Sequence, residues 1–450
     1  MPSVRSATAA TLAFYVVSAL ALGVLATQRP GFAIALIIGG FVVMSALYKP
    51  DIFACIAVGS TFFSRFSFEE GGFRVRAEMA VGIIAGIAIL LKPRIKSLKV
   101  SSTVLVIMSA WLAWLTIVTF VVGPSFASSL TVLLWLALNI LTVYYIVCFV
   151  SDVRVIVTIG IRLALGSAIL GIAVWAIASL TGYKFLVQLD TAYGGYAAYG
   201  TLFEANILSS IVTLWSVVAL SSRLCSHVSF GARLTLIMIT PFLAIATHTR
   251  IALVGSVIVF VAAIVWLPRS RAYFAAMAVV VGIAMAVVTV DLSSLGLDKF
   301  TEPFALDEGT GRYRAVSWER AFQDLNESGW LAWASGLGAN SFGQRHLDPS
   351  LLGTGARWYL GNLPLQLLYD GGFVSVILVV VGVVRVFPYY AWRIGSVFLA
   401  VYVLFAISTS TLWLLQSWIF LAIALVDRRQ QEGGSVDLEN TPTDSFARHS

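Results

Sequence analysis

Long apolar runs follow one another along most of the chain, and only short polar connections separate them. A helix needs roughly 20 mostly apolar residues to cross a bilayer. The pattern predicts about 14 spans, or about 12 if the short segments 51–64 and 411–427 are half-spans. The predicted spans are 7–27, 31–48, 51–64, 78–92, 102–122, 128–150, 154–181, 204–220, 232–248, 251–267, 272–290, 360–384, 393–408 and 411–427. The first run resembles a signal peptide, but its length and the spans that follow favour an uncleaved span.

Composition supports a membrane protein rather than a soluble one. Of the 450 residues, 59% are hydrophobic and 11% are charged, whereas a soluble domain carries about 25% charged residues. The mean hydropathy is +0.92. We therefore expect an all-α polytopic membrane protein with about 12 to 14 transmembrane helices.

Basic residues gather in connections on one predicted side of the membrane. Lys- and Arg-rich connections stay in the cytoplasm, so this side and both termini are predicted to be cytoplasmic, in a bacterial inner membrane. The connections are 92–99, 223–233, 268–271, 385–393 and the stretch after Asp427. This retention accounts for the net charge of +7, and we expect no nucleic-acid partner. The connection 65–77 carries Arg65, Arg74 and Arg76 on the other side, as a chance exception or an external surface feature.

The spans divide the chain around one long polar loop. We expect transmembrane helices in 1–181, further helices with an external motif loop in 182–290, the external loop in 291–358, transmembrane helices in 359–428 and a disordered cytoplasmic tail in 429–450. A loop of about 68 residues is too long to be a simple connection and is more often functional. Short helices are expected within it.

Cysteine and histidine residues predict no metal site and no disulfide framework. The three cysteines are scattered, and none of the four histidines has a partner at metal-ligand spacing. No cofactor is expected.

Candidate chemistry lies on the predicted external side. The segment 182–206 is rich in Tyr and Gly, includes Tyr199, and ends at Glu204 and Asn206 near the membrane boundary. Its aromatic residues are equally consistent with interfacial anchoring. Arg250 lies in a tight turn between two apolar runs, where an arginine usually has a partner or a ligand. The alternative is that Arg250 reaches toward lipid phosphate.

The long loop carries further arginines. After Thr310 the spacing of apolar residues predicts an amphipathic helix that carries Trp318, with Arg312 and Arg314 along one face. Arg357 precedes the next span. Arginines near the bilayer suit a pyrophosphate, because guanidinium pairs bidentately with phosphate oxygens. The alternative is a solvated charged face.

Several short motifs follow one another in this half of the chain. GTLFEAN (Gly200 to Asn206) is similar to a Gly-Thr-Phe-x-x-Asn pattern, and THTRIAL is similar to Ser-Arg-x-Ala, with Arg250 at the arginine position. GRYRAVSW is similar to Arg-x-x-x-Trp, with Arg314 and Trp318 at those positions and Arg312 as an alternative register. SGLGANSF and GNLPLQLLYDGGF complete the series. In this order, over residues 195–385, the motifs resemble the O-antigen ligase and polymerase superfamily.

The resemblance implies a metal-independent, membrane-embedded glycosyltransferase of the GT-C type. Its donor and acceptor would be undecaprenyl-diphosphate-linked glycans on the periplasmic side, and a chain-length regulator is a further expected partner. The implied diphosphate ligands are Arg250, Arg312 and Arg314, the candidate bases are Glu204, His346 and Asp370, and the implied substrate contacts are Tyr199, Asn206, Trp318, Arg357 and Asn362.

One departure from the family pattern bears on the reaction. Ligases of this family carry a histidine where this chain has Gly361, which favours polymerisation of lipid-linked repeat units over transfer to lipid A–core. His346 is a candidate substitute for that histidine. Asp370 stands at the family's glutamate position, as a base or a structural cap. Ligation is the alternative within the class, and a lipid-linked glycan transporter or flippase is the alternative from another class.

Overall fold

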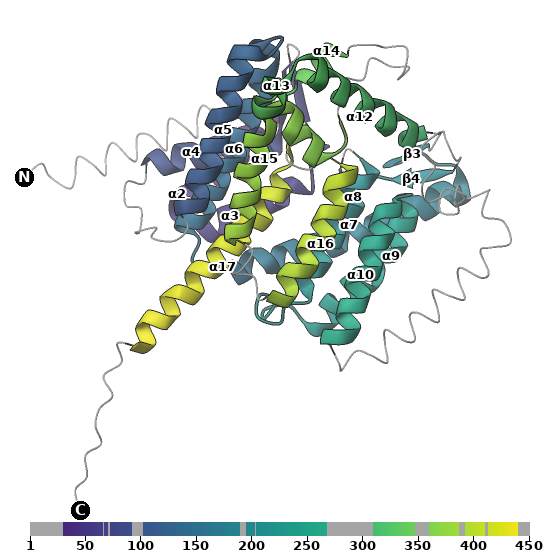
Figure 1. The fold of residues 1–450 in the computed structure, drawn as a ribbon. Helices are drawn as coiled ribbons and strands as arrows, with labels where there is room; N and C mark the ends of the chain where they lie inside the picture. Colours follow the sequence, from purple (N-terminus) through teal and green to yellow (C-terminus); the bar gives the residue numbers. More distant parts are fainter. Residues whose placement is uncertain are drawn as a thin grey trace, which may run out of the picture.

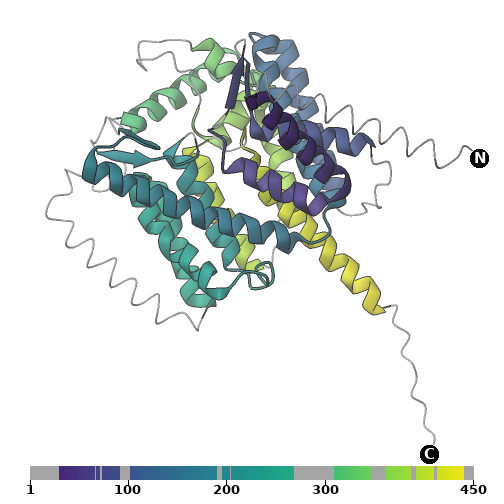
Figure 2. The same ribbon diagram turned by 180° about the vertical axis from the view of Figure 1, so that it is seen from behind.

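The computed structural model of the protein is a bundle of long helices with shorter helices packed across one end (Figures 1 and 2). It describes residues 30–65, 67–70, 73–91, 102–189, 195–202, 204–267, 309–346, 360–386, 392–409 and 413–439. The predicted spans 7–27 and 272–290 lie outside these ranges.

The helices of the bundle follow the predicted spans closely. They are α2 (Pro30–Tyr48), α3 (Pro50–Thr61), α4 (Ala77–Leu91), α5 (Ser102–Val122), α6 (Phe126–Phe149), α7 (Val153–Thr181), α8 (Ala205–Ala219), α9 (Phe230–Ala246), α10 (Arg250–Trp266), α15 (Leu363–Val386), α16 (Trp392–Ser408) and α17 (Leu415–Glu439). Among the described residues, four helices are long and apolar enough to cross a membrane, within α5, α6, α7 and α15, and shorter apolar helices accompany them. The protein is an all-α polytopic membrane protein, as the pattern predicted.

Local sequence explains where several helices begin and end. Pro50 opens α3, where its missing N–H costs no hydrogen bond. The Ser125 side chain caps α6 by accepting from the Ser128 backbone N–H, and Asp152 caps α7 in the same way through Arg154. Helix α7 ends at Gly182, which adopts the left-handed conformation with φ 71°.

Close packing between the helices relies on small residues. Gly160 of α7 faces the ring of the fully buried Trp215 of α8, and a Cβ at Gly160 would lie 2.1 Å from that ring. A Cβ at Gly82 of α4 would lie 2.6 Å from the Leu138 side chain of α6. Small residues let helix backbones approach closely where lipid supplies no hydrophobic driving force between helices.

The predicted external loop forms helices that lie across one end of the bundle, which we call the α12 end. They are α12 (Gly309–Glu327), α13 (Trp330–Ser335) and α14 (Ser341–Arg345). Two antiparallel hairpins lie at the same end, β1 (Ser67–Glu70) with β2 (Phe73–Arg76) and β3 (Val187–Leu189) with β4 (Tyr196–Ala198) (Figures 1 and 2). The amphipathic helix predicted after Thr310 is α12.

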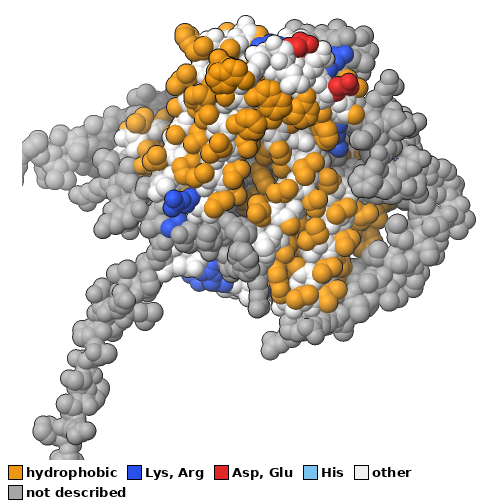
Figure 3. All heavy atoms as spheres, viewed as in Figure 1, with side chains coloured by type: hydrophobic (Ala, Val, Ile, Leu, Met, Phe, Trp, Pro, Cys, Tyr) orange, Lys and Arg blue, Asp and Glu red, His pale blue; other side chains and the backbone are white. Residues whose placement is uncertain are grey.

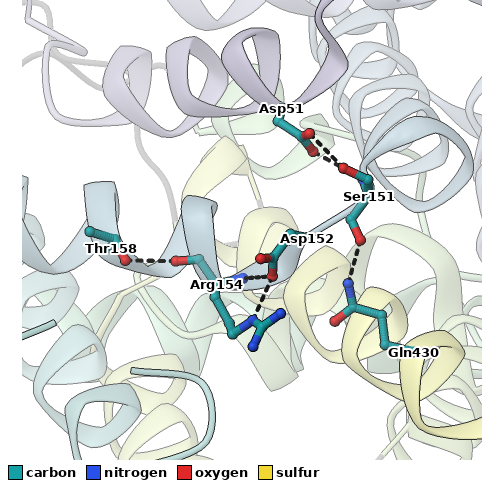
Figure 4. Close-up of polar contacts among 6 residues, drawn as sticks. All are labelled: Asp51, Ser151, Asp152, Arg154, Thr158 and Gln430. Carbon is teal, nitrogen blue, oxygen red and sulfur yellow. Dashed lines mark hydrogen bonds and ion pairs between the residues drawn. The ribbon is translucent and has the colours of Figure 1, made fainter. Parts of the chain in front are cut away.

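At the opposite end, the turn between α6 and α7 is held by neighbouring helices. Asp51 of α3 accepts from the backbone N–H of Ser151 at 2.9 Å and from its hydroxyl at 2.6 Å (Figure 4). Gln430 of α17 donates to the Ser151 carbonyl at 2.6 Å, and Arg429 donates to carbonyls at the end of α6. These contacts order the turn of α17 that follows the predicted span. Helix α17 extends to Glu439, into the segment 429–450 for which disorder is predicted.

Candidate functional site

At the α12 end, the turn between α9 and α10 is joined to the start of α8. Thr249 precedes Arg250, the first residue of α10, and its hydroxyl donates to the Asn206 side-chain oxygen at 3.0 Å. Glu204 is the N-cap residue of α8. The turn passes through His248, which is buried and adopts a left-handed conformation with φ 50°. The structure thus gathers Glu204, Asn206 and Arg250 at the ends of two helices that pack together.

Arg314 reaches the same group of helices from the long loop. It lies on α12, and its guanidinium donates to the carbonyl of Ser408 at 2.8 Å. Ser408 is the last residue of α16, where the helix leaves carbonyls without intrahelical partners. Helix α16 packs against both α8 and α10. We call Glu204, Asn206, Arg250 and Arg314 the arginine rim.

Tyr199 lies beside the arginine rim, directly after β4. The Arg65 guanidinium lies 4.1 Å from the centre of the Tyr199 ring, in a cation–π contact. The Arg65 backbone N–H also donates to the Thr201 carbonyl at 3.3 Å, so the end of α3 is fixed to the segment before α8. Arg65, which sequence reasoning treated as a chance exception or a surface feature, therefore supports a predicted site residue.

His346 belongs to a second cluster, formed by α12, the residue after α14, and α15. Its Nε2 lies 2.7 Å from the Asp324 carboxylate, and the Tyr369 hydroxyl donates to the same carboxylate oxygen. The Phe342 ring packs against His346 and Tyr369, with centroid distances of 4.7 and 5.3 Å. His346 and Asp324 keep side-chain exposures of 18% and 17%, so the pair reaches the surface of the protein. We call Asp324, His346 and Tyr369 the histidine cluster.

Sequence reasoning missed Asp324, although the helical pattern contains a clue. Asp324 lies three residues after Ala321 and one before Leu325, and both of these apolar residues are fully buried. An acidic residue at that phase of an amphipathic helix turns toward the packed face and therefore needs a partner. The partner proved to be His346.

Asp370 has a different environment from His346. Only 3% of its surface is exposed, and its carboxylate accepts from Gln366 one turn earlier at 2.7 Å. The Leu337 and Gly338 backbone N–H groups donate to the carbonyls of Tyr369 and Asp370 at 2.7 and 2.9 Å. Asp370 thus lies in a packed seam between α15 and the glycine-rich segment before α14, which favours the structural alternative for this residue.

Glycine is required on both sides of this seam. A Cβ at Gly336 would lie 2.4 Å from the Gly371 nitrogen, and a Cβ at Gly372 would lie 2.2 Å from the Ala334 carbonyl oxygen. Both residues have left-handed φ, 82° and 66°, and α15 is kinked at Gly372. The motif SGLGANSF is therefore needed for close backbone packing.

The segment before α15 is fixed by two predicted site residues. Trp318 donates from its indole nitrogen to the buried Leu360 carbonyl at 3.2 Å, and Asn362 accepts from the Leu365 backbone N–H at 2.9 Å as a helix cap. Gly361, between Leu360 and Asn362, has a left-handed φ of 57°. Arg312 belongs to the first turn of α12. Arg357 lies outside the described residues.

Glu78 and Asn139 form a further polar group that sequence reasoning missed. Glu78, in the first turn of α4, is 2% exposed and accepts from the Leu415 backbone N–H. Asn139 of α6 donates to the Trp413 carbonyl at 3.3 Å. Together they hold the segment that leads from α16 into α17. An acidic residue at the start of a predicted span was the available clue.

Within the described residues, no group of three or more His, Cys, Asp or Glu side chains could hold a metal ion. The described site residues lie in two polar groups, one that contains Arg250 and Arg314 and one that contains the His346–Asp324 pair.

Comparison with known proteins supports the resemblance seen in the motifs. The family model of the O-antigen ligase matches residues 234–380. The matched range contains Arg250, Arg314 and the histidine cluster. No curated protein matches the chain.

Proposed function

We propose that this chain, which belongs to the O-antigen ligase-related superfamily through its domain at residues 234–380, polymerises polyprenyl-diphosphate-linked oligosaccharide repeat units. The enzyme would be a metal-independent GT-C-type glycosyltransferase of the bacterial inner membrane. The observation that carries this proposal is that one family-matched segment supplies Arg250, Arg314 and His346. Of the basic connections, the described 223–233 and Arg429 after Asp427 lie at the opposite end, so the α12 end would face the periplasm.

The reaction transfers a glycan between two lipid carriers. A hydroxyl oxygen of the acceptor glycan attacks the anomeric carbon of the donor, and a new glycosidic C–O bond forms. The bond from that carbon to the diphosphate oxygen breaks, and undecaprenyl diphosphate leaves with the electron pair. Negative charge develops on the leaving diphosphate. Arg250 of α10 and Arg314 of α12 would therefore stabilise the transition state, together with Arg312, which also lies on α12.

The proton of the attacking hydroxyl needs an acceptor. His346 suits this role, because Asp324 holds Nε2 and leaves Nδ1 to receive the proton, as in other histidine–carboxylate pairs. Tyr369 would keep the Asp324 carboxylate in place. Glu204 is the alternative base, since it lies on the arginine rim, whereas the buried Asp370 would act through packing.

The residue at position 361 favours polymerisation over ligation as the reaction. The family's ligases carry a histidine where this chain has Gly361, which is buried and adopts a left-handed conformation. Purified protein given a lipid-linked oligosaccharide alone should form a polymer ladder. When lipid A–core is added as a second acceptor, transfer to it without a polymer ladder would instead identify a ligase. Movement of the lipid carrier across the bilayer without glycosidic bond formation would identify a flippase.

Single arginine replacements test the proposed role of the rim. Arg250→Ala and Arg314→Ala should each shorten or abolish the polymer in cells, at normal protein levels. Arg154→Ala is the matched control, because Arg154 lies at the opposite end of the bundle. Wild-type polymer from both rim variants would reject the proposal. Lysine replacements then test geometry, since full rescue by lysine would mean that bidentate pairing is unnecessary.

A further inference from the structure

An apolar groove of about 160 Å³ lies between α5, α15, α16 and α17. Its walls include Trp111 of α5, Val379 and Val383 of α15, Phe398 of α16 and Trp418 of α17. Among the lining residues, only Tyr402 and Ser417 carry hydroxyl groups. Such a lining favours a hydrocarbon ligand, because buried sugar or phosphate groups would lack hydrogen-bond partners.

The groove belongs to the apolar surface of the bundle. Beside it, α15 exposes Ile377, Val380 and Val384, and α16 exposes Val403 and Ile407. Figure 3 shows this face as a nearly continuous apolar surface that is hollowed between α15 and α16. In a membrane protein a surface of this kind contacts lipid, so a ligand can enter the groove sideways from the bilayer.

The chain connects the groove to the candidate site at Leu363. Leu363 lines the groove and directly follows Asn362, in the segment that Trp318 of α12 fixes through the Leu360 carbonyl. The second wall, α16, ends at Ser408, whose carbonyl binds Arg314 of α12. Both walls are therefore tied at their ends to the helix that carries the proposed diphosphate ligand.

We propose that this groove binds the isoprenoid tail of the lipid-linked glycan while Arg314 holds its diphosphate. The proposal rests on the proposed function and identifies where the lipid part of that substrate lies. A diphosphate at Arg314 places the first isoprene units beside Ser408 and Leu363, and the tail continues along Tyr402 and Val383. Gly395 leaves room beside Phe398 for the methyl branches of the isoprenoid chain.

Two adjacent residues of α15 provide a matched test. Val383 lines the groove, whereas Val384 is 60% exposed on the lipid side and is not among the lining residues. Val383→Phe should narrow the groove, and Val384→Phe should add the same bulk in lipid. Gly395→Leu fills the groove from the other wall and provides a second variant.

The assay compares donors that share glycan and diphosphate but differ in tail, one with an undecaprenyl tail and one with a geranyl tail. Val383→Phe and Gly395→Leu should lower kcat/KM for the undecaprenyl donor by roughly tenfold, and should leave the geranyl donor within about twofold of wild type. Val384→Phe should match wild type with both donors. Equal loss on both donors, or no loss on the undecaprenyl donor, would overturn the proposal.

A binding measurement separates the groove from the reaction. Wild-type protein in phosphatidylglycerol vesicles is crosslinked with a photoreactive analogue of undecaprenyl phosphate, and the labelled peptides are mapped. Label on α15 and α16 that undecaprenyl phosphate displaces and excess phospholipid does not would support the groove, even if no polymer forms and the proposed function fails. Label elsewhere, or displacement by phospholipid alone, would contradict it.

Discussion

At both ends of the bundle an arginine side chain donates hydrogen bonds to carbonyls at the end of a helix, but the elements that it connects differ. At the opposite end, Arg429 of α17 donates to carbonyls near the end of α6, and Arg233 of α9 donates to the carbonyls of Ala219 and Leu220 at the end of α8. At the α12 end, Arg314 donates to the last carbonyl of α16. In each case an arginine binds carbonyls that a helix end leaves without intrahelical partners.

The difference lies in what each arginine connects. Arg429 and Arg233 join helices of the bundle to one another, and Arg223 and Asp427 form an ion pair nearby. Arg314 joins a helix of the loop to the bundle at the last residue of α16, one of the helices that line the groove. The comparison suggests that arginines at the opposite end contribute to stability, whereas Arg314 contributes to position and charge at the proposed site.

The largest expected effect comes from the histidine cluster. His346→Ala should lower the rate of polymer formation by about 10²–10⁴-fold, the usual range for loss of a general base. His227→Ala, in the connection between α8 and α9 at the opposite end, should leave the rate unchanged. The rate of polymer formation, measured with purified, folded His346→Ala and His227→Ala, tests whether only the histidine of the α12 end is needed for the reaction. An active His346→Ala enzyme would transfer the role of base to Glu204.

Asp324→Asn tests how His346 is held. The amide keeps a polar group beside the imidazole but removes the negative charge that stabilises the imidazolium, so we expect a loss of about 10-fold, smaller than for His346→Ala. An unchanged rate with purified, folded Asp324→Asn would show that the pair is structural.

The contrast between Arg314 and Arg429 is expected to be second in size, after His346→Ala and ahead of Asp324→Asn. Arg314→Ala should lower the rate by about 10²–10³-fold with little change in Tm, because charge stabilisation of a leaving group is typically worth that much. Arg429→Ala should lower Tm while the rate per folded molecule stays normal. Thermal unfolding and activity measured on the same preparations test both. A lower Tm in Arg314→Ala with a normal rate, or a lower rate in Arg429→Ala with a normal Tm, would contradict these assignments.

A smaller effect is expected at the seam between α15 and the glycine-rich segment. Gly372→Ala should destabilise the protein by roughly 1–3 kcal/mol, because alanine disfavours the left-handed conformation and its Cβ would lie 2.2 Å from a carbonyl oxygen. Gly166→Ala in α7 is the control, since its Cβ would meet nothing within 4 Å. Thermal unfolding should show a loss for the first variant only.

The smallest effect concerns Asp152 at the opposite end (Figure 4). Burial alone would raise the pKa of Asp152, but hydrogen bonds and charge from Arg154, with a contribution from His227, hold this pKa below its usual value. A carboxylate with a lowered folded pKa adds stability above its unfolded pKa, and this stability is lost as the pH falls through the folded pKa. Tm should therefore fall slightly less between neutral and acidic pH in Asp152→Asn than in wild type, by a small amount for such an exposed pair. A steeper fall in the variant would contradict this sign.

Much of the candidate site could be named from the sequence because its residues stand in short motifs. Arg250, Arg314 and His346 lie in the family-matched range, and Asn206 lies in a motif before a predicted span. Asp324, Tyr369 and Glu78 could not be named in this way, since their importance depends on what they contact. Asp370 stood in a motif with two alternatives open, and its buried contacts with Gln366 and the glycine-rich segment favour the structural one.

The sequence by itself determined the helices of this protein, because the length and phase of an apolar run are local properties. Helices α5, α6, α7 and α15 start or end within a few residues of the predicted spans, and α12 has the predicted amphipathic character. Only the tertiary structure decided which polar groups meet. His346 and Asp324 are 22 residues apart in the chain, Thr249 and Asn206 are 43 apart, and Arg314 and Ser408 are 94 apart. Such contacts depend on how helices cross and where their ends come to lie, which hydrophobic periodicity does not encode.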